Sequence, residues 1–474
     1  MRPPSLRTLY TVLFFLGLFF IPFNSYMGIR ILGEYSRESA TLFFLLGSTI
    51  LAVEFLIKGR IVFPLKNGIF CAVLLFLAWC FLTTLLNIGT VSNNFFKGIS
   101  GVERFFRQYV SLLIIAFFFL VFFINVLRKM SATVILKQLR RVFLVSLIIV
   151  AIYGALETLI IVFGVGQLKP LLFYFDYFPF TRVYFSGDRI SGVSYETPAL
   201  ALYLITICGW MLSYIITSKG IWRFVPALLV LELTFFSGSR TGLVVVSLQY
   251  LTFFGFLMFF KEYRKNVVYL FSGFVMVVGI ALLFSGGKLI EEAKIKLDSL
   301  NFEQNLLTSI SNRSRFGMQY ASLQVFKDEP VIGVGFGELA FHAYKYYPAW
   351  AITNNYEFST NYKNQRRDSF PPTYNLYLRI MAECGLVGLI LFLAIILLAI
   401  YRCLKLIAQP VEDQRILGLV TLVSIVGFTF NWLQTDAFRI FGFWICVAIL
   451  CVPLKKDNLL ETQGNIGDAE ITKL

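Results

Sequence analysis

The chain has 474 residues, of which 58% are hydrophobic, 17% aromatic and only 15% charged. Water-soluble domains carry about 25% charged residues, so the composition excludes an ordinary soluble protein. The formal net charge of +15 would suggest nucleic-acid binding in a soluble chain. No base-reading motif accompanies it, and the basic residues lie between apolar runs as they do in membrane proteins, so we expect no nucleic-acid partner.

Apolar runs long enough to cross a bilayer as helices recur along the whole chain. They predict about twelve spans, near residues 8–26, 40–57, 68–87, 106–127, 141–163, 198–217, 222–236, 242–260, 266–285, 375–400, 414–432 and 439–453. The first run follows a basic N-terminus without a small-residue cleavage site, which favours an uncleaved span over a signal peptide. The sequence therefore predicts an all-α integral membrane protein whose solvent is the lipid bilayer.

Basic clusters occupy the segments that share a side with the N-terminus, notably 58–66, 128–141, 261–265, 402–415 and 455–456. Positively charged loops face the cytoplasm, so both termini are expected there. This orientation places 164–197, 237–241, 286–371 and 433–438 on the outer face. We expect one membrane domain, with spans in 1–285, a large outer loop at 286–371, further spans in 372–455 and a polar cytoplasmic tail at 456–474.

The large loop has patterns of its own. Residues 288–300 place apolar side chains on one helical face, which predicts a helix lying on the membrane or on other loops. A second helix is expected to start after Asn312 or Ser314 and to end before Pro330. Residues 344–370 are rich in Tyr, Asn, Lys and Arg and predict an exposed loop able to hold a sugar. The glycine-rich stretch 333–337 favours a tight turn that passes close to the membrane.

Three arginines stand at the outer ends of spans: Arg189 in GDRISGVSYETP, Arg240 in SGSRTG and Arg315 in NRSRFGMQYA. An ionisable residue near membrane depth is costly and suggests a function. The forked guanidinium group suits phosphate, so the three together could hold a diphosphate and stabilise its charge as it leaves. Each alone could instead reach a lipid headgroup or pair with a carboxylate. No dense Asp/Glu cluster suggests a metal site, and no cofactor is expected.

Four segments form an ordered chain of short motifs: RISGVSYETPALALYL (189–204), SGSRTGLVV (237–245), RFGMQYASLQVFKDEPVIGVGFG (315–337) and YNLYLRIMAECGLVGLILFL (374–393). In this order, and with the large loop between the second and the last, they resemble the O-antigen ligase and O-antigen polymerase family of bacterial envelope glycosyltransferases. Each motif alone is weak, whereas the ordered set is fairly specific. The resemblance covers roughly residues 185–400 by motif, and the rest by the pattern of spans only.

The resemblance implies a multi-span helical fold related to the GT-C class and a metal-independent, inverting glycosyl transfer on the outer, periplasmic face of the bacterial inner membrane. The donor would be a glycan on undecaprenyl diphosphate, and the acceptor a second lipid-linked glycan, with a chain-length regulator as a further partner. Arg189, Arg240 and Arg315 fall on the family's arginine positions and are carried over as ligands of the donor diphosphate. Asn375 and Arg379 are expected to add to the substrate site, although Arg379 could simply pair.

One departure separates the chain from the ligases, which carry His-Asn where this chain has Tyr374-Asn375. The family's ligases are thought to activate the acceptor hydroxyl with that histidine, so its absence favours a polymerase of lipid-linked repeat units. Glu196 is the first candidate for the base, because partial burial at a span entrance would raise its pKa; a salt bridge to Arg189 is its alternative. His342, the single histidine, is second. Tyr374 is third, since a phenol is a poor base.

Two other functions compete with the polymerase. A ligase of the same family would transfer the finished polysaccharide to lipid A-core. A transporter or flippase would carry out no chemistry, but transporters usually bind substrate near the bilayer midplane and contain internal repeats. The sequence instead has charges at the outer ends of spans and no repeat, so it favours an enzyme.

Overall fold

The computed structural model describes residues 5–454 except 60, 186–188, 261, 266–267, 270–293, 295–308 and 368. Within these residues the β structure is a single small hairpin, in which β1 (Phe95–Phe96) pairs antiparallel with β2 (Ile99–Ser100). The longer helices are α1 (Leu6–Phe20), α2 (Ser39–Lys58), α3 (Gly68–Leu86), α5 (Gly101–Leu113), α6 (Leu120–Leu127), α7 (Ala132–Ile161), α9 (Thr197–Leu212), α11 (Val225–Ser237), α12 (Arg240–Phe259), α16 (Ile310–Asp328), α19 (Leu376–Ile407), α20 (Glu412–Asn431) and α21 (Phe441–Cys451). The short ones are η1 (Arg30–Tyr35), α4 (Ile88–Asn93), η2 (Ile114–Phe119), η3 (Gly166–Leu168), α8 (Lys169–Phe173), η4 (Tyr174–Tyr177), α10 (Tyr214–Thr217), η5 (Ile221–Phe224), α17 (Leu339–Ala343), η6 (Tyr344–Tyr346), α18 (Ala349–Ile352) and η7 (Phe358–Tyr362).

Eight helical segments of the described chain are long and apolar enough to cross a membrane, and α1 and α21 are shorter apolar helices. Each coincides with a predicted span, and α11 lies on the run predicted at 222–236. The predicted span 266–285 and the predicted helix 288–300 lie outside the described residues. The all-α membrane class is therefore confirmed, whereas the number of about twelve spans and the relation to the GT-C class stay predictions.

Several helix ends differ from the prediction: α7 begins at Ala132 rather than near 141, α5 at Gly101 rather than near 106, and α19 ends at Ile407 rather than near 400. Helix α1 ends at Phe20 rather than near 26, because Pro22 has no backbone N–H with which to continue the helical hydrogen bonds. Helix α16 begins at Ile310, slightly before the predicted start, and ends at Asp328, ahead of Pro330 as predicted.

The prediction of an exposed loop at 344–370 is wrong in part, since η6, α18 and η7 form within it. Its aromatic side chains Tyr347, Phe358 and Tyr362 are buried, and they pack with α16 residues such as Met318 in a small apolar core. These three rings therefore hold the loop together, while Tyr344 and Tyr356 are exposed and the expected sugar binding stays a prediction. Each such ring contributes stability roughly in proportion to the apolar area that it removes from water.

Helix α19 is broken at Gly385, whose φ of +66° interrupts the helical ladder. The glycine-rich turn fits into the break: Val334 N donates to Ala382 O at 3.0 Å, and Gly335 N donates to Glu383 O at 3.0 Å. A side chain at Gly333 would collide with the Glu383 backbone, because a Cβ there would lie 2.5 Å from the Glu383 carbonyl carbon. The predicted tight turn is confirmed, and it satisfies backbone groups that lipid could not satisfy.

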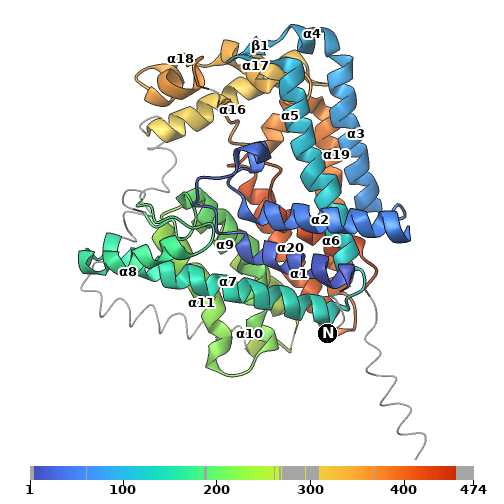
Figure 1. Cartoon of the computed structure of the whole chain (residues 1–474), viewed down its shortest axis with the longest axis vertical. Helices are drawn as coiled ribbons and strands as arrows, with labels where there is room; N and C mark the ends of the chain where they lie inside the picture. Colours follow the sequence, from blue (N-terminus) through green and yellow to red (C-terminus); the bar gives the residue numbers. More distant parts are fainter. Residues whose placement is uncertain are drawn as a thin grey trace, which may run out of the picture.

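Segments predicted to share the outer side do meet one another. Figure 1 shows α16, α17 and α18 beside α4 and β1 at the same end of the molecule. Lys97, in the turn of the β-hairpin, donates to Asn361 O and Ser369 O of the large loop at 2.6 and 2.7 Å. In the same way, the segment between α1 and α2 reaches the last outer loop, where Glu34 pairs with Arg439. This gathering fits the predicted alternation of loops, while the compartment that they face stays a prediction from charge.

Candidate functional site

Two of the three predicted arginines lie within electrostatic reach of the third, Arg240. Arg240 begins α12, Arg315 lies in the second turn of α16, and Arg189 lies in the segment before α9. The like charges of Arg189 and Arg315 both act on Arg240. The Arg189 side chain also lies against Gly238, where a Cβ would sit 3.5 Å from its Cγ and Cδ. The structure thus brings together charges from three distant parts of the chain, and this group is called the arginine cluster below.

Arg240 and Arg315 of the arginine cluster each donate a hydrogen bond to a neutral side-chain amide. Arg240 Nη2 donates to Asn312 Oδ1 at 3.4 Å, and Arg315 Nη1 donates to Gln434 Oε1 at 3.5 Å. In the described part of the chain, neither Arg189 nor Arg315 forms an ion pair. Mutual repulsion of the guanidinium groups costs free energy, which an anion placed among them would offset. Forked donors around one point suit a phosphate or diphosphate.

A buried carboxylate fixes the segment that carries Arg189. Glu157, on α7, is fully buried, and it accepts hydrogen bonds from Ser191 N at 3.0 and 3.1 Å and from Gly192 N at 2.8 Å. Further along the segment, Tyr195 N donates to Asn24 Oδ1 at 3.0 Å. The backbone next to Arg189 is therefore held from the protein side. Glu157 was not predicted as a site residue, although an acid inside a predicted span is a signal of function or structure.

Tyr374 lies beside the arginine cluster. The Arg315 guanidinium carbon is 5.2 Å from the centre of the Tyr374 ring, and the Tyr374 hydroxyl shares a 2.6 Å hydrogen bond with the Tyr362 hydroxyl. Burial raises the pKa of Tyr374 above its ordinary value of 10, and the nearby charge of Glu357 adds to this. The phenol is therefore neutral at physiological pH and can donate a hydrogen bond, but it is a poor proton acceptor.

Asn375 and Arg379 have structural partners at the start of α19. The Asn375 side chain accepts from Leu378 N at 3.1 Å and caps the helix. Arg379 donates to Gln108 Oε1 at 2.8 Å and to Asp436 O at 3.0 Å, and it pairs with Glu383 Oε2 at 3.2 Å. The pairing that the sequence left open for Arg379 is thus observed.

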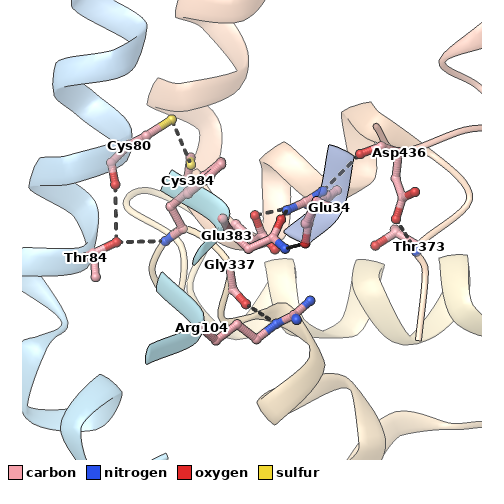
Figure 2. Close-up of polar contacts among 12 residues, drawn as sticks. Glu34, Cys80, Thr84, Arg104, Gly337, Thr373, Glu383, Cys384 and Asp436 are labelled. Atoms are coloured by element: carbon pink, nitrogen blue, oxygen red, sulfur yellow. Dashed lines mark hydrogen bonds and ion pairs between the residues drawn. The ribbon is translucent and has the colours of Figure 1, made fainter. Parts of the chain in front are cut away.

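Arg379 belongs to a polar cluster that lines a cavity of about 150 Å³, here called the first cavity. Figure 2 shows Glu34 and Glu383 at the centre of this cluster, with Asp436 on one side and Arg104 on another. Arg104 Nε donates to Gly337 O at 3.0 Å, and Asp436 accepts from Thr373 N at 2.6 Å. The cluster therefore ties the large loop to α5, α19 and the last outer loop.

Glu196 lines a second, larger cavity of about 350 Å³. This second cavity shares Glu34 and Arg439 with the first, and Glu38 and Thr435 lie in its wall. Glu196 is exposed, and in the described residues it forms no ion pair, so the salt bridge to Arg189 considered from the sequence is not present.

The hydrogen-bond partner of His342 lies outside the arginine cluster. The Nε2 atom of His342 is 3.4 Å from Asn94 Nδ2, at the base of the β-hairpin. Burial and the charge of Lys345 lower the pKa of His342 below its ordinary value, so the ring is neutral at physiological pH. Among the described residues, none of the hydrogen bonds of His342 reaches an arginine of the cluster.

Several residues that complete the site were not predicted. They are Glu34 and Glu38 between α1 and α2, Gln108 on α5, Glu157 on α7, Asn312 on α16 and Gln434 in the last outer loop. Glu34 and Glu38 are two carboxylates four residues apart at the predicted outer end of a span. Like the arginines, ionisable residues at such a position suggest a function. The amides carry no such signal, because their part depends on tertiary contacts alone.

Fold and site together define an integral membrane protein with a cationic cluster where its helix ends meet a large folded loop. The family model described as O-antigen ligase matches residues 225–393, a stretch that holds Arg240, Arg315, Tyr374 and Arg379. The chain has no significant match among curated proteins. The family match confirms the resemblance found in the motifs and supports assignment to the O-antigen ligase and polymerase family. It supports glycosyl transfer of the ligase or polymerase type in surface polysaccharide biosynthesis.

Proposed function

We propose that the protein polymerises oligosaccharide repeat units carried on undecaprenyl diphosphate, for O-antigen or a related surface polysaccharide. The transfer is metal-independent and inverts the anomeric carbon, and it takes place on the periplasmic face of the bacterial inner membrane. A lipid-linked glycan donor, a lipid-linked acceptor and a chain-length regulator are the partners. The observation that supports this proposal best is the convergence of Arg189, Arg240 and Arg315.

In this proposal the arginine cluster binds the diphosphate of the donor. As the bond from the anomeric carbon to the diphosphate breaks, negative charge grows on the leaving oxygen, and fixed positive charges stabilise it without reorganisation. Arg189 and Arg315 are not neutralised by carboxylates in the described chain, so their charge is available to an anion. Asn375 and Arg379 would contact the glycan from the start of α19.

Polymerase is preferred to ligase because of Tyr374. Its raised pKa and its hydrogen bond to Tyr362 leave no proton acceptor at the position where the family's ligases carry histidine. Of the three predicted bases, Glu196 is the one that lines the second cavity described above. The ligase is the second candidate, favoured by the description of the matching family. The break in α19 is a feature of many transporters, but here protein backbone fills it.

The test supplies purified protein in nanodiscs with an undecaprenyl-diphosphate-linked repeat unit, in the presence of EDTA. A polymerase produces a ladder of longer lipid-linked glycans. A second reaction adds lipid A-core to preformed polymer. Conjugation there without a ladder in the first reaction would identify a ligase and refute the polymerase, and the absence of both products would refute glycosyl transfer.

The carboxylate that holds the Arg189 segment offers a further prediction. Glu157→Gln replaces an acceptor oxygen by an N–H group that faces the backbone donors of Ser191 and Gly192, so the segment shifts. We expect transfer to fall roughly tenfold or more, since a displacement of about 1 Å at a site costs up to ~100-fold. Initial rates measure this. The control is Glu232→Gln, which removes an exposed carboxylate from α11 and should leave the rate unchanged; equal rates for both variants would contradict the role of Glu157.

A further inference from the structure

The second cavity offers a place for the acceptor. We propose that it binds the hydroxyl-bearing end of the acceptor glycan, and that Glu38 takes the proton from the attacking hydroxyl. This inference rests on the proposed function and adds to it the location of the second substrate and a catalytic residue that the sequence analysis did not consider.

Two residues that line the second cavity belong to segments that also carry the arginine cluster or its partners. Thr435 in the wall of this cavity follows Gln434, which accepts a hydrogen bond from Arg315. Glu196, also in its wall, closes the short segment that begins with Arg189. The proposal places a glycan end in this cavity beside a diphosphate held by the arginines, which is the arrangement that a transfer between two substrates requires.

The second cavity differs from the arginine cluster in charge, because carboxylates as well as guanidinium groups line it. Three carboxylates, those of Glu34, Glu38 and Glu196, face it together with the guanidinium groups of Arg37 and Arg439. A diphosphate would meet repulsion from the carboxylates, whereas sugar hydroxyls are neutral donors that carboxylates accept well. The volume of about 350 Å³ lies within the range of roughly 300–1,000 Å³ that small-molecule sites occupy.

The lining of the second cavity also includes apolar side chains. Ile21, Leu202 and Phe441 come from three separate segments, the end of α1, α9 and the start of α21. A sugar has apolar faces as well as hydroxyls, so a cavity lined by both polar and apolar side chains suits it. The Tyr195 ring in the wall, with the Arg37 guanidinium carbon 5.1 Å from its centre, adds an aromatic surface.

Glu38 has the contacts of a proton acceptor. Its Oε1 lies 3.5 Å from Arg439 Nε, at the outer limit of a hydrogen bond, and its Oε2 has no hydrogen-bond partner in the described residues. Arg439 also pairs with Glu34, so Glu38 receives only part of its charge. Burial raises the pKa of Glu38 to about 7, against the opposing effect of Arg439. A base whose pKa lies near the working pH is the most effective.

The acceptor hydroxyl oxygen forms a bond to the anomeric carbon of the donor on the face opposite the diphosphate. The bond from that carbon to the diphosphate oxygen breaks, and its electron pair leaves with undecaprenyl diphosphate on the arginine cluster. The hydroxyl proton passes to the Glu38 carboxylate. Glu196, exposed at the rim, accepts hydrogen bonds from other hydroxyls of the same sugar.

The test uses an acceptor that cannot act as donor, an alkyl glycoside of the repeat unit without diphosphate, together with the undecaprenyl-diphosphate donor. Glu38→Gln is expected to lower kcat at pH 7 by about 100-fold or more, with an unchanged KM for the donor. The wild-type rate should fall as pH decreases through about 7, because the base becomes protonated, and this fall should be absent in Glu38→Gln. The charged and titratable groups facing Glu38 are Arg439, Glu34, Tyr35, Arg37, Tyr26 and Tyr195.

Matched variants separate the outcomes. Glu54→Gln, elsewhere on the element that follows Glu38, should behave as wild type, and Ala199→Phe, which fills the cavity, should raise the KM for the acceptor at least tenfold and leave the KM for the donor unchanged. Glu38 is not the base if the wild type makes product while Glu38→Gln keeps the wild-type rate and its fall in rate at low pH. The same conclusion follows if Glu196→Gln, and not Glu38→Gln, loses the fall in rate at low pH. An unchanged acceptor KM in Ala199→Phe places the acceptor elsewhere. If the wild type itself makes no product, the proposed function fails instead.

Discussion

Replacing Arg240 by alanine is expected to lower kcat for glycosyl transfer by at least about 100-fold, the usual cost of removing one donor that stabilises charge in a transition state. Arg240 is the member of the cluster on which both other arginines act. Its removal therefore takes away a third of the positive charge at the point where we place the diphosphate. Steady-state rates and the affinity for undecaprenyl diphosphate measure the effect.

The same substitution should not harm the fold. Removing one of three like charges relieves repulsion, so the melting temperature of Arg240→Ala is expected to equal or exceed that of the wild type. Arg240→Lys keeps the positive charge but loses the forked donor geometry of the guanidinium group, so its rate should lie between those of the wild type and Arg240→Ala. Arg107→Ala removes an exposed arginine on α5 and serves as the control. A variant that melts earlier and keeps its rate would show that Arg240 is structural and that the diphosphate lies elsewhere.

The membrane architecture could be predicted because lipid imposes a simple rule. Backbone groups in hydrocarbon must be satisfied within the segment, so a run of ~20 apolar residues becomes a helix. The predicted run 40–57 and the observed α2, Ser39–Lys58, agree closely for this reason. The break at Gly385 could not be read in the same way. The apolar pattern continues through it, and the backbone groups that it frees are satisfied by a loop distant in sequence.

The arginine cluster was predictable because charges at the ends of apolar spans are rare and costly. Its surroundings were not. Whether Glu38 faces a cavity or solvent depends on how α1, α9 and α21 pack, and no local pattern encodes that. Composition also misled for 344–370, where Phe358 and Tyr362 are core residues of the loop. Sequence patterns thus identified the unusual groups, while their roles depended on tertiary contacts.

Arg379 shows how such contacts can be tested. Its side chain is 12% exposed and that of its partner Glu383 only 4%. Substituting Arg379 by methionine removes the charge but keeps much of the volume, so Glu383 is left buried without a counter-charge. Breaking a buried pair in this way costs about 3–5 kcal/mol. Unfolding in detergent, followed by heat or denaturant, should therefore show a large loss of stability for Arg379→Met.

A matched pair on the neighbouring helix supplies the control. Glu103 and Arg107 are also four residues apart on a helix, but their side chains are 46% and 60% exposed. Arg107→Met should cost no more than about 1 kcal/mol, as exposed pairs do. The double variant Arg379→Met/Glu383→Leu should recover much of the stability, since an apolar pair replaces the ionic one. If that double variant is stable and fully active, the predicted role of Arg379 in substrate binding is wrong; if it is stable and inactive, Arg379 or Glu383 contacts the glycan.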